Sequence, residues 1–136
     1  MVLAFLMMQG VRVERTNPPV QSDISVKPDI KPILHKACYN CHSNETAWPW
    51  YSRVSPASWL IANDVRSGRQ RLNFSEWGDY WIRVQSRKLD KVAQKVMGSE
   101  MPPWYYAMMQ SDADLTPTDR GQVWAWATTE SEAISK

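Results

Sequence analysis

The chain has few of the residues that mark several common classes of protein. Only two of its 136 residues are cysteine, and they lie three positions apart, so a secreted framework of several disulfide bonds is excluded. Only five residues are glycine, whereas nine are proline and eight are tryptophan, so we expect stiff loops between aromatic-rich helical segments. The formal net charge of +2 gives no support for a nucleic-acid partner.

No apolar run is long enough to cross a membrane as a helix. Residues 2–8 are wholly apolar, but seven residues fall short of the roughly 20 that a bilayer requires. We interpret residues 1–16 as a truncated signal peptide or the remnant of a membrane anchor, with a short buried helix or strand as the alternative. Residues 17–28 are polar and rich in proline, which predicts an extended tether, and residues 29–136 suit a single domain.

No segment alternates apolar and polar residues over the length of a strand, whereas apolar residues recur at helical spacing in several places. Gly68 and Gly98 are predicted to end two of the helices, and Thr116 with Asp119 predicts a capping box that begins the last. Residues 101–106 are predicted to form a stiff loop. The predicted helices cover residues 29–41, 56–67, 80–97 and a final stretch from 117, whose buried side would be Val123, Trp124, Trp126 and Ala127.

The two cysteines belong to the sequence Cys38-Tyr39-Asn40-Cys41-His42, the C-x-x-C-H attachment signature of a c-type haem. Cysteines three apart on a helical turn lie on one face, so both sulfurs can reach the two vinyl groups on one edge of a porphyrin. His42 follows directly and is placed to turn a neutral imidazole toward the iron. We therefore predict one haem c, bound covalently through Cys38 and Cys41, with His42 as an iron ligand.

Other interpretations of the cysteine pair are less favoured. A disulfide between the two would close a very short loop and add little stability. A thioredoxin-like redox pair needs a strand-containing setting that the sequence does not predict. A closed zinc site needs four ligands, and the only soft candidates, His35 among them, all fall within eight residues. The last alternative is that the cysteine pair has no chemical role.

A sixth iron ligand is expected from a methionine. His35, the only other histidine, lies one helical turn before Cys38 and is not expected to reach the opposite haem face. Met101 is favoured because it follows Gly98 and precedes two prolines, which push it out of helical geometry and stiffen the loop. A thioether also suits haem iron. The less favoured alternatives are Met97, Met108, Met109 or no protein ligand at all. Met97 lies on an apolar stripe, so if it is not a ligand we expect it to be a core residue.

Other residues near the motif are candidates for contact with the cofactor. Side chains that would wall the haem or donate to its propionates are Trp48, Pro49, Trp50, Tyr51, Trp59 and Pro102, with ordinary core packing as the alternative. The carbonyl of Pro49 or Pro56 is a candidate acceptor for the second ring N–H of His42. Arg53, Arg66 and Arg69 are candidate partners of the propionates, with a solvated face as the ordinary interpretation.

Several longer motifs resemble one family. The sequence CYNCHSNETAWPWYSRVSPASWLIANDVRSGRQRLNFSEW, then GSEMPPWYY and a last Leu-Thr-x-x-x-Arg helix, resembles the haem-binding domain family of small bacterial monohaem c-type cytochromes. The resemblance covers about residues 17–128 and implies an exported domain, often carried on an N-terminal membrane segment. It implies that Cys38 and Cys41 hold the haem, that His42 is the proximal ligand and that Met101 is the distal ligand. The full-length apolar span usual at the start of such proteins is missing.

Together these observations predict an all-α fold, a small cytochrome c-like bundle of four to five short helices around one haem, with an extended N-terminal segment. The predicted function is a non-enzymatic c-type cytochrome that carries single electrons through a haem ligated by His42 and Met101. The alternatives are a haem-based sensor or small-ligand binder with a labile Met101, and a non-haem metal or structural domain. We expect redox protein partners or a respiratory complex, no nucleic acid, and possible membrane anchoring through the N-terminus. The expected location is the periplasm or the outer face of the cytoplasmic membrane.

Overall fold

The computed structural model describes residues 1–136 and confirms an all-α fold without β-strands. Its α-helices are α1 (Val2–Gln9), α2 (Lys31–Ala37), α3 (Tyr39–His42), α4 (Ala57–Arg71), α5 (Ile82–Met97), α6 (Trp104–Met109) and α7 (Pro117–Ser135). Three short 3-10 helices join them, η1 (Trp50–Arg53), η2 (Trp77–Asp79) and η3 (Ser111–Ala113). The number of α-helices exceeds the predicted four or five because the expected helix over 29–41 is broken in two, the expected loop over 101–106 contains one, and residues 2–9 form another.

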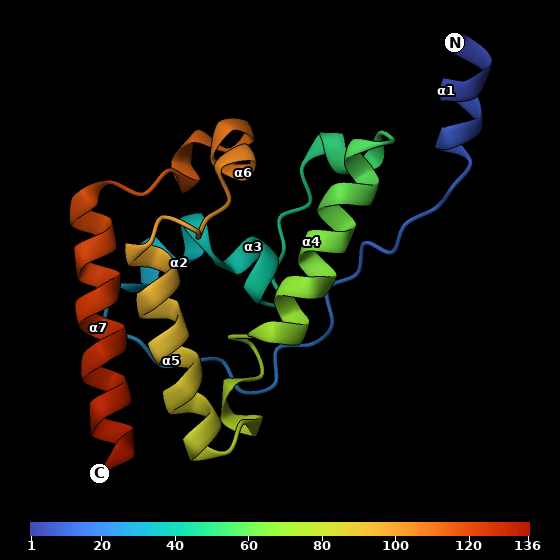
Figure 1. Cartoon of the computed structure of the whole chain (residues 1–136). Helices are drawn as coiled ribbons and strands as arrows, with labels where there is room; N and C mark the ends of the chain where they lie inside the picture. Colours follow the sequence, from blue (N-terminus) through green and yellow to red (C-terminus); the bar gives the residue numbers. More distant parts are fainter.

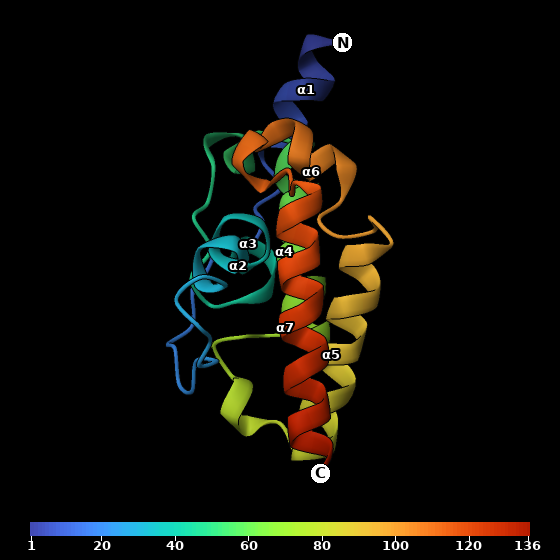
Figure 2. The same ribbon diagram turned by 90° about the vertical axis from the view of Figure 1, so that its left-hand side faces the viewer.

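The two longest helices, α5 and α7, pack side by side and run in opposite directions (Figures 1 and 2). The apolar stripe of α5 buries Leu89 and Val96 against α7, which buries Val123 and Trp126. Trp124 was predicted to share this buried side, but it is 45% exposed. Consecutive residues of an α-helix point about 100° apart, so a helix that buries Val123 turns Trp124 toward solvent.

The residues before α2 lie along the surface of the domain and contribute to its core. Ile24 is buried, and its backbone N–H donates to the carbonyl of Phe74. The hydroxyl of the buried Tyr39 donates to the carboxylate of Asp23 at 3.0 Å. The predicted tether therefore packs against the haem-motif segment in an extended form.

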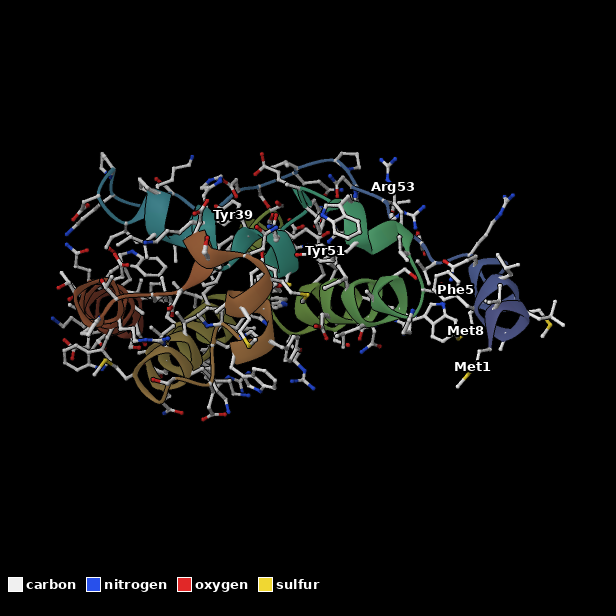
Figure 3. The ribbon with its side chains drawn as sticks, turned by 90° about the horizontal axis from the view of Figure 1, so that it is seen from above. Met1, Phe5, Met8, Tyr39, Tyr51 and Arg53 are labelled. Atoms are coloured by element: carbon white, nitrogen blue, oxygen red, sulfur yellow. The ribbon has the colours of Figure 1, made fainter.

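α1 projects from one end of the molecule and has no buried residue (Figures 1 and 3). The amide group of Gln9, its last residue, donates to the Ser55 carbonyl and accepts from the Ser55 N–H, which joins α1 to the start of α4. Exposure contradicts the alternative of a buried helix at residues 2–8. None of the helices combines the length and the apolar composition needed to cross a bilayer.

Two of the predicted helix ends are confirmed and one is wrong. α7 begins with a capping box, because Thr116 Oγ1 accepts from the Asp119 N–H while the Asp119 carboxylate accepts from the Thr116 N–H. α5 ends at Gly98, as expected. α4, however, runs through Gly68 to Arg71, so Gly68 is a residue of the helix interior and has another role, described below.

Candidate functional site

The segment Cys38–His42 forms α3 and the turn before it, and it lies between α2 and α4. Cys38 separates α2 from α3 because its carbonyl accepts both the Cys41 and the His42 N–H and so begins a new turn. The two thiols are free and line one pocket of about 290 Å³. The helical turn therefore places both sulfurs at the same pocket, as the spacing predicted.

Both cysteines are held as neutral thiols. Burial raises the pKa of Cys38 to about 12, with a smaller contribution from the neighbouring Cys41. Burial also raises the pKa of Cys41 to about 12, helped by the charge of Asp64 and opposed by that of Arg69. A thioredoxin-like redox cysteine needs a lowered pKa, so this environment disfavours thiol redox chemistry for the pair.

The His42 ring is oriented by two backbone carbonyls at the end of α4. Its Nδ1 lies 3.1 Å from the carbonyl oxygens of both Gly68 and Leu72. Because both neighbours can only accept, Nδ1 carries the hydrogen and Nε2 keeps the lone pair that a metal requires. Burial lowers the pKa of His42, and the charges of Arg71 and Lys88 add to this against the two hydrogen bonds, so the imidazole is neutral.

The prediction that a prolyl carbonyl, of Pro49 or Pro56, accepts from the His42 ring is wrong. The carbonyl of Pro49 accepts from Ser52 within η1, and the carbonyl of Pro56 accepts from the first residues of α4. Both carbonyls are therefore used locally. The acceptors come from the other end of α4. They are the Gly68 carbonyl, which also accepts from the Leu72 N–H, and the carbonyl of Leu72, the residue that follows the helix.

Gly68 makes this arrangement possible because α4 approaches the haem motif very closely at that residue. A Cβ atom on residue 68 would stand 2.3 Å from the Cys41 carbonyl oxygen and 3.0 Å from its carbonyl carbon. Real Cβ atoms do not approach backbone atoms so closely. Gly68 therefore allows α4 and α3 to pack in close contact. This role explains why a glycine lies inside the helix, although glycine lowers helix stability by roughly 0.5–1 kcal/mol relative to alanine.

Another part of the pocket lining comes from the loop between α5 and α6. Met101, Pro102 and Pro103 line the pocket from this side. The Met101 N–H donates to the Lys95 carbonyl. The guanidinium of Arg120, on α7, donates through Nη1 to the carbonyl of Met101 at 2.9 Å and to that of Val96 at 2.8 Å. The backbone of Met101 is therefore fixed from both sides.

A second pocket of about 410 Å³ adjoins the first, and Cys38, His42, Arg71 and Met101 line both. Its remaining walls come from the end of α4, from Phe74 and from α5. The lining of both pockets is largely apolar, with basic side chains at the second. A covalently bound haem needs two thiols, two groups that can ligate iron, and apolar walls. The pockets offer two thiols, a neutral imidazole and a thioether from separate elements, and an apolar lining. The residues therefore fit that cofactor.

Two tyrosines of α6, the helix that follows the Met101 loop, form hydrogen bonds with α3 and α4. The sequence analysis did not select them as site residues. The Tyr105 hydroxyl donates to the Asp64 carboxylate of α4 at 2.8 Å, and the Asn40 amide of α3 donates to the Tyr106 hydroxyl at 2.7 Å. Burial raises the pKa of each phenol to about 12, so both stay neutral. Both residues line the first pocket.

The predicted wall residues divide into two groups. Pro49 and Pro102 line the first pocket, whereas the aromatic candidates Trp48, Trp50, Tyr51 and Trp59 line neither. Trp50 is 77% exposed, and the Trp48 indole donates to Asn17. The Tyr51 hydroxyl and the Trp59 indole N–H are buried and have no hydrogen-bond partner. Their contact with propionates stays a prediction.

The predicted arginines lie elsewhere. Arg53 is exposed and points away from the body of the molecule (Figure 3). Arg69 donates to the carbonyls of Ser43 and Thr16, which binds the N-terminal segment to the haem-motif loop. Arg66 bonds only Asn63 within α4. Arg71, which the sequence analysis did not select, is the arginine that lines both pockets.

The competing iron ligands do not reach the pockets. Met97 was interpreted as a core residue if not a ligand, but it is 53% exposed because it lies on the solvent side of α5, and Met108 and Met109 are exposed on α6. His35 is exposed, and its ring stacks on Tyr39 with 3.9 Å between centroids. No cluster of three histidine, cysteine, aspartate or glutamate side chains in residues 1–136 could hold a metal ion, which disfavours the zinc alternative.

Comparison with known proteins supports haem binding by this chain. The family model described as "Haem-binding domain" matches residues 3–129, which is nearly the whole chain. No curated protein and no solved structure matches the chain. The matched stretch contains the cysteine motif and Met101, which line the first pocket, and Arg120, which donates to the Met101 carbonyl. The chain therefore belongs to the haem-binding domain family.

Proposed function

We propose that the protein is a monohaem c-type cytochrome that carries single electrons and is not an enzyme. In this proposal Cys38 and Cys41 attach the haem covalently, and His42 and Met101 are its two axial ligands. The observation that carries the proposal is that His42 and Met101, which come from separate elements, line the same two pockets together with Cys38. A haem held there supplies one-electron chemistry at its iron.

The residues of the chain suit an electron carrier. Hydrogen bonds from Nδ1 to Gly68 and Leu72 hold the His42 ring in one orientation, which a metal ligand needs. A methionine ligand favours the reduced state and raises the reduction potential. If His42 and Met101 both bind the iron, no position would be left on it for a substrate. The Tyr105 hydroxyl donates to Asp64 and the Tyr106 hydroxyl accepts from Asn40, and both phenols are neutral.

The alternative is a haem-based sensor or small-ligand-binding domain in which Met101 dissociates. Met101 lies in a loop, and the hydrogen bonds that hold it act on its backbone rather than on its side chain. This placement is the feature that favours the alternative. The two functions differ in whether the sixth position of the reduced iron is open to a gas.

We further propose redox protein partners, alone or within a respiratory complex, and a location in the periplasm or on the outer face of the cytoplasmic membrane. The support is α1, which has no buried residue, is apolar from Val2 to Met8 and is joined to the domain through Gln9, so its surface is suited to an apolar environment. Fractionation of cells that produce the full chain, with and without residues 1–16, tests this proposal. Recovery of both forms in the same soluble cytoplasmic fraction would contradict it.

The deciding experiment is the visible spectrum of the reduced protein with and without carbon monoxide, after expression with haem-attachment machinery. A sharp low-spin c-type spectrum that the gas does not change supports a closed His42/Met101 iron and an electron carrier. A prompt change supports the sensor. Covalent attachment is tested separately: the colour should stay with the denatured wild-type chain and leave the chain in the Cys38→Ser, Cys41→Ser double variant.

A further inference from the structure

One side of α5 carries a line of lysines beside the second pocket. Lys88, Lys91 and Lys95 are spaced three and four residues apart, so they share one side of the helix. Arg71 lies across the pocket at the end of α4, and all four side chains line the pocket wall. We call these four residues the basic rim.

The positive charge of the chain is concentrated on α5. Residues 82–97 contain five basic side chains and one acidic side chain, a net charge of +4. The whole chain has a net charge of +2, so all residues outside α5 together have a net charge of −2. The near-neutral total therefore conceals a local positive surface, which the overall charge could not reveal.

The basic rim is only partly neutralised by the protein itself. Residues 1–136 form two salt bridges, and only one of them, between Lys95 and Glu100, involves the rim. Lys88 donates to the Arg71 carbonyl and lies 4.5 Å from the centre of the Tyr80 ring, while Lys91 and Arg71 have no carboxylate partner. Like charges three or four residues apart destabilise a helix. The contacts of Lys88 and Lys95 offset part of this repulsion, whereas Lys91 and Arg71 have no such carboxylate or aromatic contact.

Apolar residues line the same pocket as these charges. They are Leu72, Phe74, Val92 and Val96, and His42 and Met101 line the pocket with them. The basic side chains therefore lie at the pocket assigned to the redox centre, which an electron-transfer partner has to approach. Complementary charge steers such an encounter.

We propose that the basic rim is the docking surface for an acidic redox partner protein. This inference rests on the proposed electron-carrier function and adds the place and the chemistry of the partner. A nucleic acid is disfavoured because the positive surface is confined to one helix and the end of another. An anionic membrane is disfavoured because α1, the apolar element, lies beyond α4 on the side away from α5 (Figures 1 and 3).

The kinetic test uses the full-length, haem-loaded protein and two small oxidants of opposite charge, ferricyanide and a cationic cobalt(III) phenanthroline complex. The test variant is Lys91→Glu with Lys95→Glu. The matched control is Lys27→Glu with Lys31→Glu, which makes the same change in net charge at exposed lysines outside the pocket. At low salt we expect the test variant to react about tenfold more slowly with ferricyanide and faster with the cobalt complex. The control should change by less than about twofold, and roughly 0.5 M salt should abolish the differences.

The second test does not depend on electron transfer. A glutamate oligopeptide is added to the ¹⁵N-labelled protein, and amide shifts are mapped by NMR. We expect shifts confined to α5 and the end of α4 in the wild-type protein, and their loss in the test variant but not in the control.

Three results would overturn the inference. Equal kinetic effects in the test variant and its control would show that only net charge matters, and a peptide footprint elsewhere would place the acidic partner on another surface. Loss of haem, or a potential shift with salt-independent rates, would show that the rim pairs with the carboxylates of the cofactor instead. The two proposals can fail separately. Binding of carbon monoxide to the reduced iron would contradict the electron-carrier function. The NMR footprint of the acidic peptide tests the docking surface independently of that result.

Discussion

Gly68 of α4 and Cys41 of the haem motif are in backbone contact: a Cβ atom on residue 68 would lie 2.3 Å from the Cys41 carbonyl oxygen. The same approach brings the carbonyls of Gly68 and Leu72 to 3.1 Å from His42 Nδ1. The cysteine motif and the helix that orients its histidine are therefore one packed unit. A side chain between them would displace the imidazole as well as the helix.

Replacement of Gly68 by alanine should destabilise the protein by about 3 kcal/mol or more, because the added methyl group meets backbone rather than a flexible side chain. Gly121→Ala in α7 is the matched control. No atom lies within 4 Å of the Cβ position there, so alanine should stabilise that helix by up to about 1 kcal/mol. Thermal unfolding measures both effects, and the yield of haem-loaded protein should fall only in Gly68→Ala. Equal stability of the two variants would contradict the close contact.

Replacement of Met101 by alanine should open the sixth position of the iron and lower the reduction potential, because the thioether is the proposed distal ligand. Met97→Ala is the control, since Met97 is an exposed methionine outside both pockets. Spectra of the ferric form and redox titration give the result. An unchanged ferric spectrum in Met101→Ala would remove Met101 from the site.

Replacement of Arg120 by alanine should weaken the hold on Met101, because the carbonyls of Met101 and Val96 lose their donor. The loss of hydrogen bonds from a charged group should cost about 1.5–3 kcal/mol. Arg120 is a positioning residue, so carbon monoxide should bind the reduced variant faster, and Arg120→Lys should restore part of the wild-type behaviour.

Thr116→Ala is the control for Arg120. It removes the N-cap of the same helix, α7, and should destabilise it by about 1 kcal/mol without touching Met101. If Thr116→Ala speeds carbon monoxide binding as much as Arg120→Ala does, the effect of Arg120 is only a loss of stability.

Asp119 should make the stability of α7 depend on acid pH. The hydrogen bond from Lys36 and those with Thr116 lower the pKa of Asp119 below its ordinary value of 3.8. A carboxyl group with a lowered pKa in the folded state stabilises the protein above its unfolded pKa, and this stability is lost as the pH falls through the folded pKa. Asp119→Asn should therefore be less stable than wild type near pH 7, by at most about 1 kcal/mol for so accessible a pair. The difference should decrease as the pH falls below about 3.8 and vanish once the pH is below the lowered pKa of the folded protein. A difference that persists at acid pH would contradict the charge-based explanation.

The sequence by itself determined the features that depend on neighbouring residues. The spacing of Cys38, Cys41 and His42 lies within one helical turn, and the capping box at Thr116 spans three residues, so both follow from local geometry. The all-α class also follows from short-range periodicity. Met101 could be chosen because two prolines follow it directly, and the structure does bring it to the pockets that contain His42.

Tertiary structure decided everything that joins residues far apart in the chain. A glycine within a helical pattern predicts a helix end, but Gly68 lies in the interior of α4. Only its close contact with Cys41 explains the glycine at that position. The partners of His42 lie 26 and 30 residues away, and Arg120 lies 19 residues from Met101. Local propensity carries no record of such pairs, because they form only when helices pack and carbonyls at helix ends and in loops accept from donors of another element.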